Sequence, residues 1–570
     1  MKVCDYIVDF LNKKNIHTMF GYIGGYNADI IDAFCQKQEN RFVLNYHEQA
    51  AAFAVNTYAI ISEQVAVVTA SGAPSSCNLV AGIANAYFDS NPCLFLVGSV
   101  HSLAVRESNK IRQNGFEEVD MVSLVAGITK YAVKITDAND IMYELEKAFY
   151  IASSGRKGPV LVDIPYDIAR MDIAGDNMRR FDIPTLSEYD ELDFAAVMAL
   201  LNKAKRPVVL LGGGTRSAMC RKSIKQLLNK VKIPMVASLC GIDVLSHDNE
   251  CYSGFIGHYG NRYANLAVAN CDLLIVLGSR LDERQLGGFY TKLDDARIIR
   301  VDIDKHELGR KLPETLSYYS SAEDFLAEFV KQDFSHCDFT KWLSVIALWK
   351  QRYPSLDNYK TVVSALDLLH EISDYLPRNA LICADVGQNQ MCAAQALRLD
   401  GDRRMFNSAG YGSMGFSLPA AIGCAYAEPK TCVLSINGDG GIQMNIQELH
   451  TIKRDNLPVN IIVLNNNCLG MIRKTQANLF NSRNYVSVDG YSAPNFKELA
   501  RAYDIPYIRI DSVDKYIDVK DFISSEQPRF IEVILPLQMD NSPEPGASIE
   551  KQSPLLSDIE YAQIKGECES

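Results

Sequence analysis

A glycine-rich turn that carries one carboxylate, together with a later pair of amides, has the strongest chemical potential in this chain. Asp439 lies in the Gly-Asp-Gly-Gly run 438–441, directly after the apolar segment 431–436, and two asparagines at 465–466 follow the apolar segment 457–464. If both runs lie at the ends of neighbouring parallel strands, the side-chain oxygens of Asp439 and of an asparagine are suited to hold a divalent metal. The bare backbone N–H groups of the glycine turn are suited to bind a diphosphate. Gly-Asp-Gly alone also forms ordinary turns, which is the alternative.

A second candidate is the carboxylate of Glu48, which follows His47 at the start of a predicted helix that is otherwise small and apolar. A carboxylate on such a face is costly without a partner, and a functional contact would supply one. The alternative is an ordinary acidic residue stabilised by the dipole at a helix N-terminus. The small-residue loops at 20–25 and 70–79 either admit close backbone approach or form plain turns.

Parallel strands must position these residues, and the chain alternates apolar runs with helical patterns in three blocks. This alternation predicts an α/β fold class with three successive open parallel-sheet domains and helices on both faces of each sheet. The predicted domains are 1–170, 190–332 and 360–536, with a linker at 171–192, a helical connection at 333–358 and a tail at 537–570. The predicted strands are 65–69, 93–97, 159–164, 207–211, 235–238, 272–277, 298–303, 380–384, 431–436, 459–464 and 530–534. Ligands of such sheets bind beyond the carboxyl ends of the strands.

Composition argues against several classes of function. The 570 residues are 48% hydrophobic and 22% charged, which is typical of a globular chain, and the net charge of -12 argues against a general nucleic-acid surface. No apolar run is long enough to span a membrane. The N-terminus begins with an amphipathic helix rather than a signal sequence, so we expect a cytoplasmic protein. The 15 cysteines include no CxxC pair and are expected to be free thiols.

Several motifs in one order give the chain a family resemblance. Over residues 1–536 it resembles the thiamine-diphosphate (ThDP) enzymes of the acetolactate synthase and pyruvate oxidase family, and acetolactate synthases most of all. The matching stretches are His47-Glu48, the runs 155–165, 386–391 and 410–423, and the pair 438–441 with 465–466. In this family the first and third domains come from different subunits, so the resemblance implies a homodimer or homotetramer with active sites at the subunit interface.

The resemblance also implies the residues that hold ThDP and Mg²⁺. Asp439, Asn466 and the carbonyl of Cys468 are implied as ligands of the metal, which bridges the diphosphate. The other implied ThDP-binding residues are Gly387, Gln388, Asn389, Gly412, Met414, Gly440, Gly441 and Met471. Glu48 of a neighbouring subunit is implied to bond the pyrimidine ring, which favours the tautomer that removes the thiazolium proton. Phe116 and Glu117 complete the implied catalytic set.

The central domain matches the flavin-binding positions of acetolactate synthases, so the resemblance implies FAD there. The matching positions are Arg156, Gly212, Gly213, Arg280 and Asp302. Glycines let a backbone reach a diphosphate, and arginines pair with it. The alternative is a degenerate nucleotide domain that binds nothing.

The chain departs from acetolactate synthases where the acceptor substrate would bind. Glu117 replaces a usual glutamine, Thr475 aligns with a tryptophan that favours 2-ketobutyrate, and His258 stands where methionine is usual. Arg284, which orients the acceptor carboxylate in the family, is retained. A charge on Glu117 would repel a keto-acid carboxylate unless that group is protonated or turned away.

The resulting hypothesis is a ThDP- and Mg²⁺-dependent enzyme that decarboxylates a 2-keto acid, pyruvate, and transfers the two-carbon unit to a second carbonyl. One alternative keeps this donor step but uses another acceptor, such as a keto-sugar of surface-polysaccharide synthesis. A second alternative is a non-catalytic ThDP-binding protein, which the retention of Glu48 disfavours. For the tail at 537–570, disorder is the simplest prediction and a lid over the site is the alternative.

Overall fold

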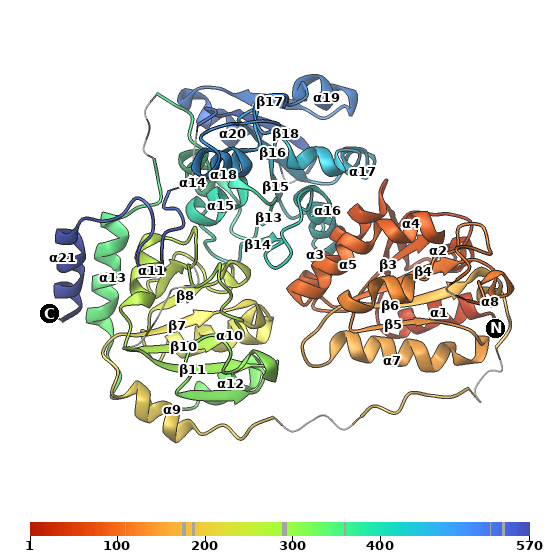
Figure 1. Cartoon of the computed structure of the whole chain (residues 1–570), viewed down its shortest axis with the longest axis horizontal. Helices are drawn as coiled ribbons and strands as arrows, with labels where there is room; N and C mark the ends of the chain where they lie inside the picture. Colours follow the sequence, from red (N-terminus) through yellow and green to blue (C-terminus); the bar gives the residue numbers. More distant parts are fainter. Residues whose placement is uncertain are drawn as a thin grey trace.

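A computed structural model of the chain describes residues 1–108, 110–173, 178–184, 189–287, 293, 295–357, 359, 361–524, 526–538 and 542–569. These residues form three α/β domains, each built on one six-stranded parallel sheet with helices on its faces (Figure 1). The predicted fold class is confirmed. In Figure 1 the N-terminal domain in red and orange lies beside the central domain in yellow and green, and the C-terminal domain in cyan and blue lies above both.

The N-terminal sheet has the strand order β2-β1-β3-β4-β6-β5. Its strands are β1 (Thr18–Gly21), β2 (Arg41–Leu44), β3 (Ala66–Ser71), β4 (Cys93–Ser99), β5 (Tyr131–Lys134) and β6 (Val160–Pro165). Its helices are α1 (Val3–Lys13), α2 (Ala28–Cys35), α3 (Glu48–Ser62), α4 (Gly72–Asn78), α5 (Val80–Asp89), α6 (Met121–Val125), α7 (Ile141–Ser153) and α8 (Tyr166–Ala169). Ile7 and Leu11 of α1 are buried, so the amphipathic first helix is confirmed.

The central sheet has the order β12-β11-β10-β7-β8-β9, in which the third strand along the chain lies at one edge and the sixth at the other. Its strands are β7 (Pro207–Leu211), β8 (Met235–Ala237), β9 (Tyr252–Phe255), β10 (Leu273–Leu277), β11 (Arg297–Asp302) and β12 (Leu316–Tyr319). Its helices are α9 (Phe194–Leu201), α10 (Ala218–Leu228), α11 (Arg262–Ala269) and α12 (Ala322–Phe329). This is the doubly wound order that binds dinucleotides between its first and fourth strands.

The C-terminal sheet repeats the strand order of the N-terminal sheet, as β14-β13-β15-β16-β18-β17. Its strands are β13 (Leu381–Ala384), β14 (Arg404–Asn407), β15 (Val433–Gly438), β16 (Val459–Asn465), β17 (Tyr507–Ile510) and β18 (Arg529–Ile534). The helices from this part of the chain are α13 (Thr340–Arg352), α14 (Ala365–Tyr375), α15 (Gln388–Ala396), α16 (Ser417–Ala427), α17 (Glu448–Arg454), α18 (Gly470–Leu479), α19 (Phe496–Ala502), α20 (Tyr516–Phe522) and α21 (Asp558–Glu569). The 3-10 turn η8 (Gly441–Asn445) joins β15 to α17.

Every strand predicted from a continuous apolar run is present, but seven further strands were not predicted. Six of these, β2, β5, β9, β12, β14 and β17, lie at the edges of the three sheets, and β1 is next to an edge. An edge strand is paired on one side and partly exposed, as β5 is at all four of its positions. Such strands lack the unbroken apolar run that reveals a central parallel strand.

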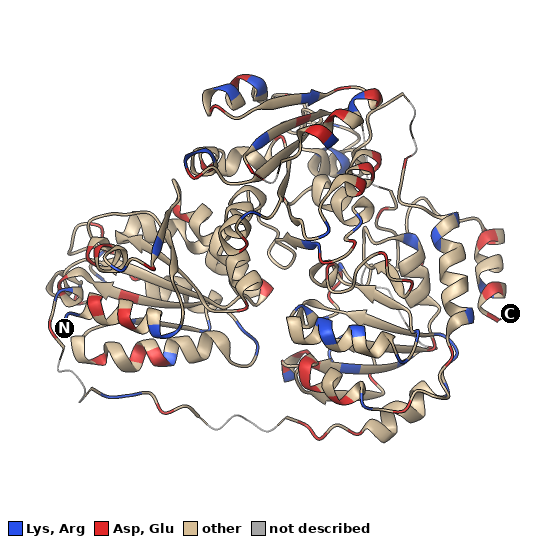
Figure 2. Cartoon of the chain, turned by 180° about the vertical axis from the view of Figure 1, so that it is seen from behind, with Lys and Arg blue, Asp and Glu red and all other residues tan. Residues whose placement is uncertain are grey.

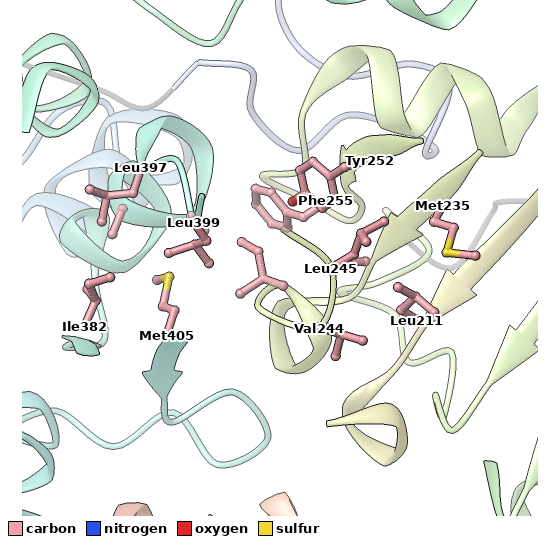
Figure 3. Packing of buried hydrophobic residues seen from close by; sticks show 14 of the residues in the cluster. Leu211, Met235, Val244, Leu245, Tyr252, Phe255, Ile382, Leu397, Leu399 and Met405 are labelled. Carbon is pink, nitrogen blue, oxygen red and sulfur yellow. The ribbon is translucent and has the colours of Figure 1, made fainter. Parts of the chain in front are cut away.

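Two hydrophobic cores cross domain boundaries and fix the C-terminal domain on the other two. One core runs from Leu211, Met235 and Phe255 of the central domain to Ile382 and Met405 of the C-terminal domain (Figure 3). The other joins the N-terminal domain to the C-terminal domain through the packing of α3 on α16. At this crossing a Cβ on Gly423 would lie 2.2 Å from the carbonyl oxygen of Ala54, so glycine is needed for the close approach.

The tail packs on the central domain, so the prediction of disorder is wrong for residues 542–569. Ile549 and Ile564 are 2% and 1% exposed, and both belong to a core that includes Trp349 of α13. Glu567 of α21 accepts hydrogen bonds from Trp349 Nε1 at 2.7 Å and from Arg352 Nη2 at 2.6 Å. The two buried isoleucines and the hydrogen bonds of Glu567 hold this segment in place although its composition is polar.

The charges on the surface agree with the composition. Figure 2 shows acidic and basic residues interspersed along the outer helices. Among the described helices, none is both long enough and apolar enough to cross a membrane. The 15 cysteines are free thiols, as expected, and most of them are buried.

Candidate active site

The cofactor residues predicted in the C-terminal domain all follow the carboxyl ends of its strands. β15 pairs in parallel with β13 on one side and with β16 on the other, and Gly438 is in register with Leu464. The turn 438–441 and the asparagines at 465–466 therefore leave the same edge of the sheet. Strands β13 and β15 also mark the point where the strand order reverses, which is where open α/β sheets bind ligands.

Asp439 is a buried carboxylate with an unused oxygen. The residue is 2% exposed, and its Oδ2 makes no hydrogen bond to any described residue. Burial raises the pKa of Asp439 to about 6. Hydrogen bonding by Tyr491 and by nearby backbone nitrogens favours the charged form but offsets only part of the cost of burial. A divalent cation would remove the remaining cost.

The neighbouring donors suit Mg²⁺ better than zinc. The amide of Asn466 lies between Gln388, whose Oε1 is 3.4 Å from its Nδ2, and the backbone nitrogen of Cys468, which is 3.3 Å from its Oδ1. Among the described residues there is no group of three or more His, Cys, Asp and Glu side chains that could hold a metal. One carboxylate, one amide and one backbone carbonyl leave the remaining positions to water and phosphate, as Mg²⁺ prefers.

Glycines keep side chains out of the space beside this edge. A Cβ on Gly441 would lie 2.0 Å from Asp385 Oδ2, and one on Gly470 would lie 1.8 Å from Gln388 Oε1. A Cβ on Gly438 would lie 3.2 Å from Asn389 Oδ1. The structure thus brings the start of α15, the 438–441 turn and the start of α18 together, as a diphosphate site between them requires.

Met414 is presented on a tight loop beside the same turn. It is 38% exposed and lies between Gly412 and Gly415, which both have φ of +77°, a conformation that favours glycine. The hydroxyl of Ser408 accepts hydrogen bonds from the backbone nitrogens of Gly412 at 3.0 Å and Ser413 at 2.9 Å. This loop conformation suits a residue that supports a bent ligand from below.

The carboxylate of Glu48 lies at the first position of α3 and is held by two side chains of α4. Ser75 donates to its Oε1 at 2.7 Å, and Asn78 donates to its Oε2 at 2.9 Å. His47 caps the helix by accepting from the backbone nitrogen of Gln49 at 3.1 Å. Glu48 is therefore oriented by its own domain, and the helix-dipole reading explains its position but not these two contacts.

The loop with Phe116 and Glu117 lies against the start of α4, near the partners of Glu48. Phe116 is 79% exposed, and Glu117 has φ of +62°, which is unusual for a residue with a side chain. The carbonyl of Glu117 accepts from the backbone nitrogen of Ala73 at 3.1 Å. The neighbouring Glu118 fixes the loop by accepting from the backbone nitrogens of Arg106 and Asn114, both at 2.7 Å.

The predicted flavin residues also lie at strand ends, where several have structural partners. Gly212 follows β7, and its missing Cβ would lie 2.1 Å from the carbonyl oxygen of Gly278 after β10, so close packing alone requires glycine there. Asp302 ends β11, is 8% exposed, and has its pKa raised to about 6 by burial. Arg280 pairs with Asp282 at 3.0 Å.

Arg156 reaches from the N-terminal domain to the central domain, and Gly213 lies in the turn after β7. Arg156 Nη1 lies 3.0 Å from Asp304 Oδ2 and 3.4 Å from Glu307 Oε1. Gly213 faces the side chain of Cys240, whose Cβ would lie 3.1 Å from an added one. The buried carboxylate of Asp302 and the glycine turn after β7 lie on either side of the strand-order reversal, which fits a dinucleotide site. Arg156 and Arg280, however, already form ion pairs.

The structure brings two of the three predicted acceptor residues together. The backbone nitrogen of His258 donates to the carbonyl of Arg284 at 2.7 Å. Burial and the positive charge of Arg284 both lower the pKa of His258. Thr475 lies elsewhere, exposed on α18, where its hydroxyl donates to the carbonyl of Met471, another predicted cofactor residue, at 3.1 Å. Met471 is half-buried at the start of that helix.

The tail connects these two places. Glu544 forms an ion pair with Lys474, next to Thr475 on α18. Gln552 donates to the carbonyl oxygens of His258 at 3.3 Å and Gly260 at 2.9 Å. The segment for which the sequence offered disorder or a lid therefore reaches from one predicted acceptor position to another.

Sequence reasoning missed two buried carboxylates that organise the site. Asp385 follows β13 and accepts from the backbone nitrogens of Gly415 at 3.1 Å and Phe416 at 2.9 Å, which ties the Met414 loop to the 438–441 turn. Glu448 begins α17 and accepts from the backbone nitrogen of Tyr46 at 2.7 Å. The position of Asp385 directly after a predicted strand was the available signal, whereas Glu448 contacts a segment some 400 residues away and gave none.

Comparison with known proteins agrees with this arrangement. Residues 1–124, 194–329 and 385–533 match the N-terminal TPP binding domain, the central domain and the C-terminal TPP binding domain of the thiamine pyrophosphate enzymes. The chain is 31% identical to the acetolactate synthase large subunit of Lactococcus lactis, over 93% of this chain and 92% of that protein. It is 33% identical to that of Cyanidium caldarium (93% and 92%) and to the probable acetolactate synthase large subunit of Methanocaldococcus jannaschii (94% and 92%).

Proposed function

The chain belongs to the thiamine pyrophosphate (ThDP) enzymes of the acetolactate synthase type, and on that premise we propose that it decarboxylates pyruvate and transfers the two-carbon unit to a second carbonyl. The observation that carries this proposal is the convergence of the unpaired Asp439 carboxylate, the Met414 loop and the glycine turn at one edge of the C-terminal sheet. Glu48, oriented by Ser75 and Asn78, is the base-side residue that a non-catalytic binding protein would not need.

In this proposal Asp439, Asn466 and the Cys468 carbonyl hold Mg²⁺, and the 440–441 backbone with Gln388 and Asn389 holds the diphosphate. Met414 supports the cofactor from below. When bound, ThDP would supply a nucleophilic carbon for the keto carbon and, in its ring, an electron sink for the decarboxylation. Glu48 holds a hydrogen bond at the pyrimidine ring nitrogen and so sets the tautomer of the ring. In this proposal the protein neutralises the charge of the diphosphate through the metal, supports the shape of the cofactor and sets where the proton lies on its pyrimidine ring.

We expect acetolactate from pyruvate alone when the enzyme is supplied with ThDP and Mg²⁺. The donor residues match those of acetolactate synthases, and Arg284 is available to orient the carboxylate of a second pyruvate. The product is measured by chromatography or mass spectrometry, with a reaction lacking Mg²⁺ as the control. Consumption of pyruvate without acetolactate would remove pyruvate as the acceptor and favour the second candidate.

The second candidate acceptor is a keto-sugar, and three positions favour it. Glu117, whose backbone φ is +62°, offers a carboxylate. His258 adds an imidazole, and Thr475 adds an exposed hydroxyl on α18. Carboxylates and hydroxyls suit the hydroxyl groups of a sugar better than they suit a second keto-acid carboxylate. Incubating pyruvate with a panel of keto acids and keto-sugars separates the two candidates by which product forms.

A homodimer, or a tetramer built from it, is part of the proposal. Large apolar side chains remain exposed on both parts of the candidate site: Phe116 at 79% in the N-terminal domain, and Met444 at 54% and Ile472 at 52% at the edge of the C-terminal sheet. A second copy of the chain would cover these side chains and bring its Glu48 to the cofactor. The mass in solution, measured by sedimentation, tests the assembly, and a monomer at micromolar concentration would count against it.

FAD in the central domain is the second cofactor that we propose. The strand order places the turns after β7 and β10 at the reversal point, and Asp302 offers a buried carboxylate for ribose hydroxyls. The purified protein is expected to be yellow, and heating is expected to release a flavin that chromatography identifies. A colourless protein that stays colourless after incubation with FAD would support the degenerate domain instead.

We also propose that the tail closes one side of the acceptor region. Replacing Glu544 by alanine is expected to raise the KM for the acceptor about fivefold, the equivalent of about 1 kcal/mol for a partly exposed ion pair. The affinity for ThDP should change little, because neither Glu544 nor its partner Lys474 is among the residues proposed to hold the cofactor. Lys551→Ala, in an exposed part of the same tail, is the matched control. An unchanged acceptor KM in Glu544→Ala would remove the tail from the site.

A further inference from the structure

The carboxylate of Glu448 joins the C-terminal domain to the residues directly before Glu48 of the same chain. Its Oε1 accepts from the backbone nitrogens of Tyr46 at 2.7 Å and His47 at 3.1 Å. Its Oε2 accepts from Asn45 Nδ2 at 2.9 Å and from Thr451 Oγ1 at 2.8 Å. The side chain is fully buried, so these four donors replace its hydration shell.

This contact reaches Glu48 through a short and rigid path. His47 is the N-cap of α3, and Glu48 is the first residue of that helix. The hydrogen bond from the backbone nitrogen of His47 to Glu448 fixes the position at which α3 begins. It therefore fixes the backbone from which the Glu48 side chain extends. One further contact holds the preceding strand end, because Arg454 of α17 donates to the carbonyl of Leu44 at 3.0 Å.

The same segment of the C-terminal domain leads to the predicted metal site. Glu448 follows Asp439 through η8, and Asn445 at the end of η8 donates to Gly415 beside Met414 at 2.9 Å and to Gln49 of α3 at 3.3 Å. One short stretch of chain therefore contacts the cofactor-supporting loop on one side and the start of α3 on the other.

We propose that Glu448 is a positioning residue that sets the place of Glu48 of its own chain, which links the metal loop of one active site to the pyrimidine-side residue of the other. This rests on the proposed function, in which Glu48 serves the cofactor of the neighbouring subunit. A purely structural role would hold the two domains together without acting on one particular site. The two roles differ in which site a substitution damages.

Glu448→Gln is the first variant, because glutamine keeps the size of the side chain and one strong acceptor but cannot accept from all four donors. We expect kcat to fall about tenfold or more, as misplacing a catalytic group does. The affinities for ThDP and Mg²⁺ should stay within about twofold, because those ligands bind other residues. Asn45→Ala loosens the same contact from the other side and should show a smaller fall of the same kind.

A readout without cofactor tests the positioning directly. Hydrogen–deuterium exchange in the peptide covering residues 42–50 of the apoprotein is expected to speed up in Glu448→Gln and in Asn45→Ala. Asp504→Asn is the matched control, because it removes a carboxylate that pairs with Lys453 of α17 rather than with Arg454. Unchanged exchange in both test variants, with unchanged kcat, would overturn the proposal.

Hybrid dimers decide which site Glu448 serves. If Glu48→Gln and Glu448→Gln are on the same chain, the site that uses Glu48 of the unmodified chain keeps its positioning, and about half of the activity should remain. If they are on opposite chains, one site lacks Glu48 and the other has a misplaced Glu48, so activity should fall about tenfold below the first hybrid. The reverse order would show that Glu448 acts on the metal loop of its own domain. An active Glu48→Gln homodimer would instead refute the role of Glu48 in the proposed function, which separates the two failures.

Discussion

Replacing Glu48 by glutamine is expected to lower kcat by about 10²–10⁴-fold, the range for loss of a positioned acid–base group. Glutamine is close to the size of glutamate, and its amide can accept from Asn78 and donate to the hydroxyl of Ser75, so both present contacts keep a partner. What is lost is the carboxyl group that, in the proposed function, bonds the ring nitrogen of the cofactor. The unfolding temperature and the ThDP affinity should therefore change little while turnover is lost.

A graded variant separates orientation from charge at this position. Ser75→Ala removes the 2.7 Å hydrogen bond to Glu48 Oε1 and leaves the carboxylate itself, so a smaller fall in kcat is expected. Turnover is measured from pyruvate consumption, and ThDP binding from quenching of protein fluorescence. Normal turnover in Glu48→Gln would refute the assignment, and loss of ThDP binding together with turnover would show a binding role instead.

Mixing two inactive variants tests whether the active site is shared between subunits. In a shared arrangement, a hybrid of Glu48→Gln with Asp439→Asn has one site in which both damaged residues meet and one site with neither. If Glu48 comes from the neighbouring subunit, the hybrid should regain about half of the wild-type activity per dimer. If each site is built within one chain, both sites of the hybrid stay damaged and no activity returns.

The central strands and the fold class could be predicted from the sequence because buried parallel strands are continuous apolar runs. The run 459–464 is such a strand, and six of the seven residues of β16 are buried. Edge strands such as β5 carry no such signal, since all four of its residues are half-buried. The packing of the tail was also hidden, because Ile549 and Ile564 are isolated apolar residues in a polar segment and their burial depends on α13 and the central domain.

The candidate site was predictable to the extent that its residues follow strands in recognisable runs. Asp439 was found from its glycine turn, and the structure places it where the strand order suggests. Glu448 could not be found in this way, because its proposed role depends on contact with residues 45–47, which are distant in the sequence. Asp385 was missed because a single aspartate after a strand is common and its partners, the backbone nitrogens of Gly415 and Phe416, appear only in the fold.

Asp439→Asn is expected to change cofactor binding and stability in opposite directions. The substitution removes the charge that a divalent cation needs, so the affinity for ThDP with Mg²⁺ should fall by about 100-fold or more. In the metal-free chain, burial raises the pKa of Asp439 from 3.8 to about 6, which means that the folded state disfavours the charged carboxylate. That penalty appears as the pH rises through this interval and amounts to about 3 kcal/mol at neutral pH. Asparagine carries no such charge, so the unfolding temperature of the apoprotein should rise.

Asp243 provides the matched control, because it is an equally buried aspartate whose environment has the opposite effect. Although burial alone would raise its pKa, Arg216 at 2.7 Å and Arg404 at 2.6 Å hold the pKa of Asp243 well below its usual range. Asp243→Asn leaves two buried cations without their partner and should destabilise the protein by about 3–5 kcal/mol. Calorimetry of both apoproteins at pH 7 measures the two shifts. If Asp439→Asn also lowers the unfolding temperature, the carboxylate serves the fold rather than a metal, because a residue kept for a ligand costs stability when that ligand is absent.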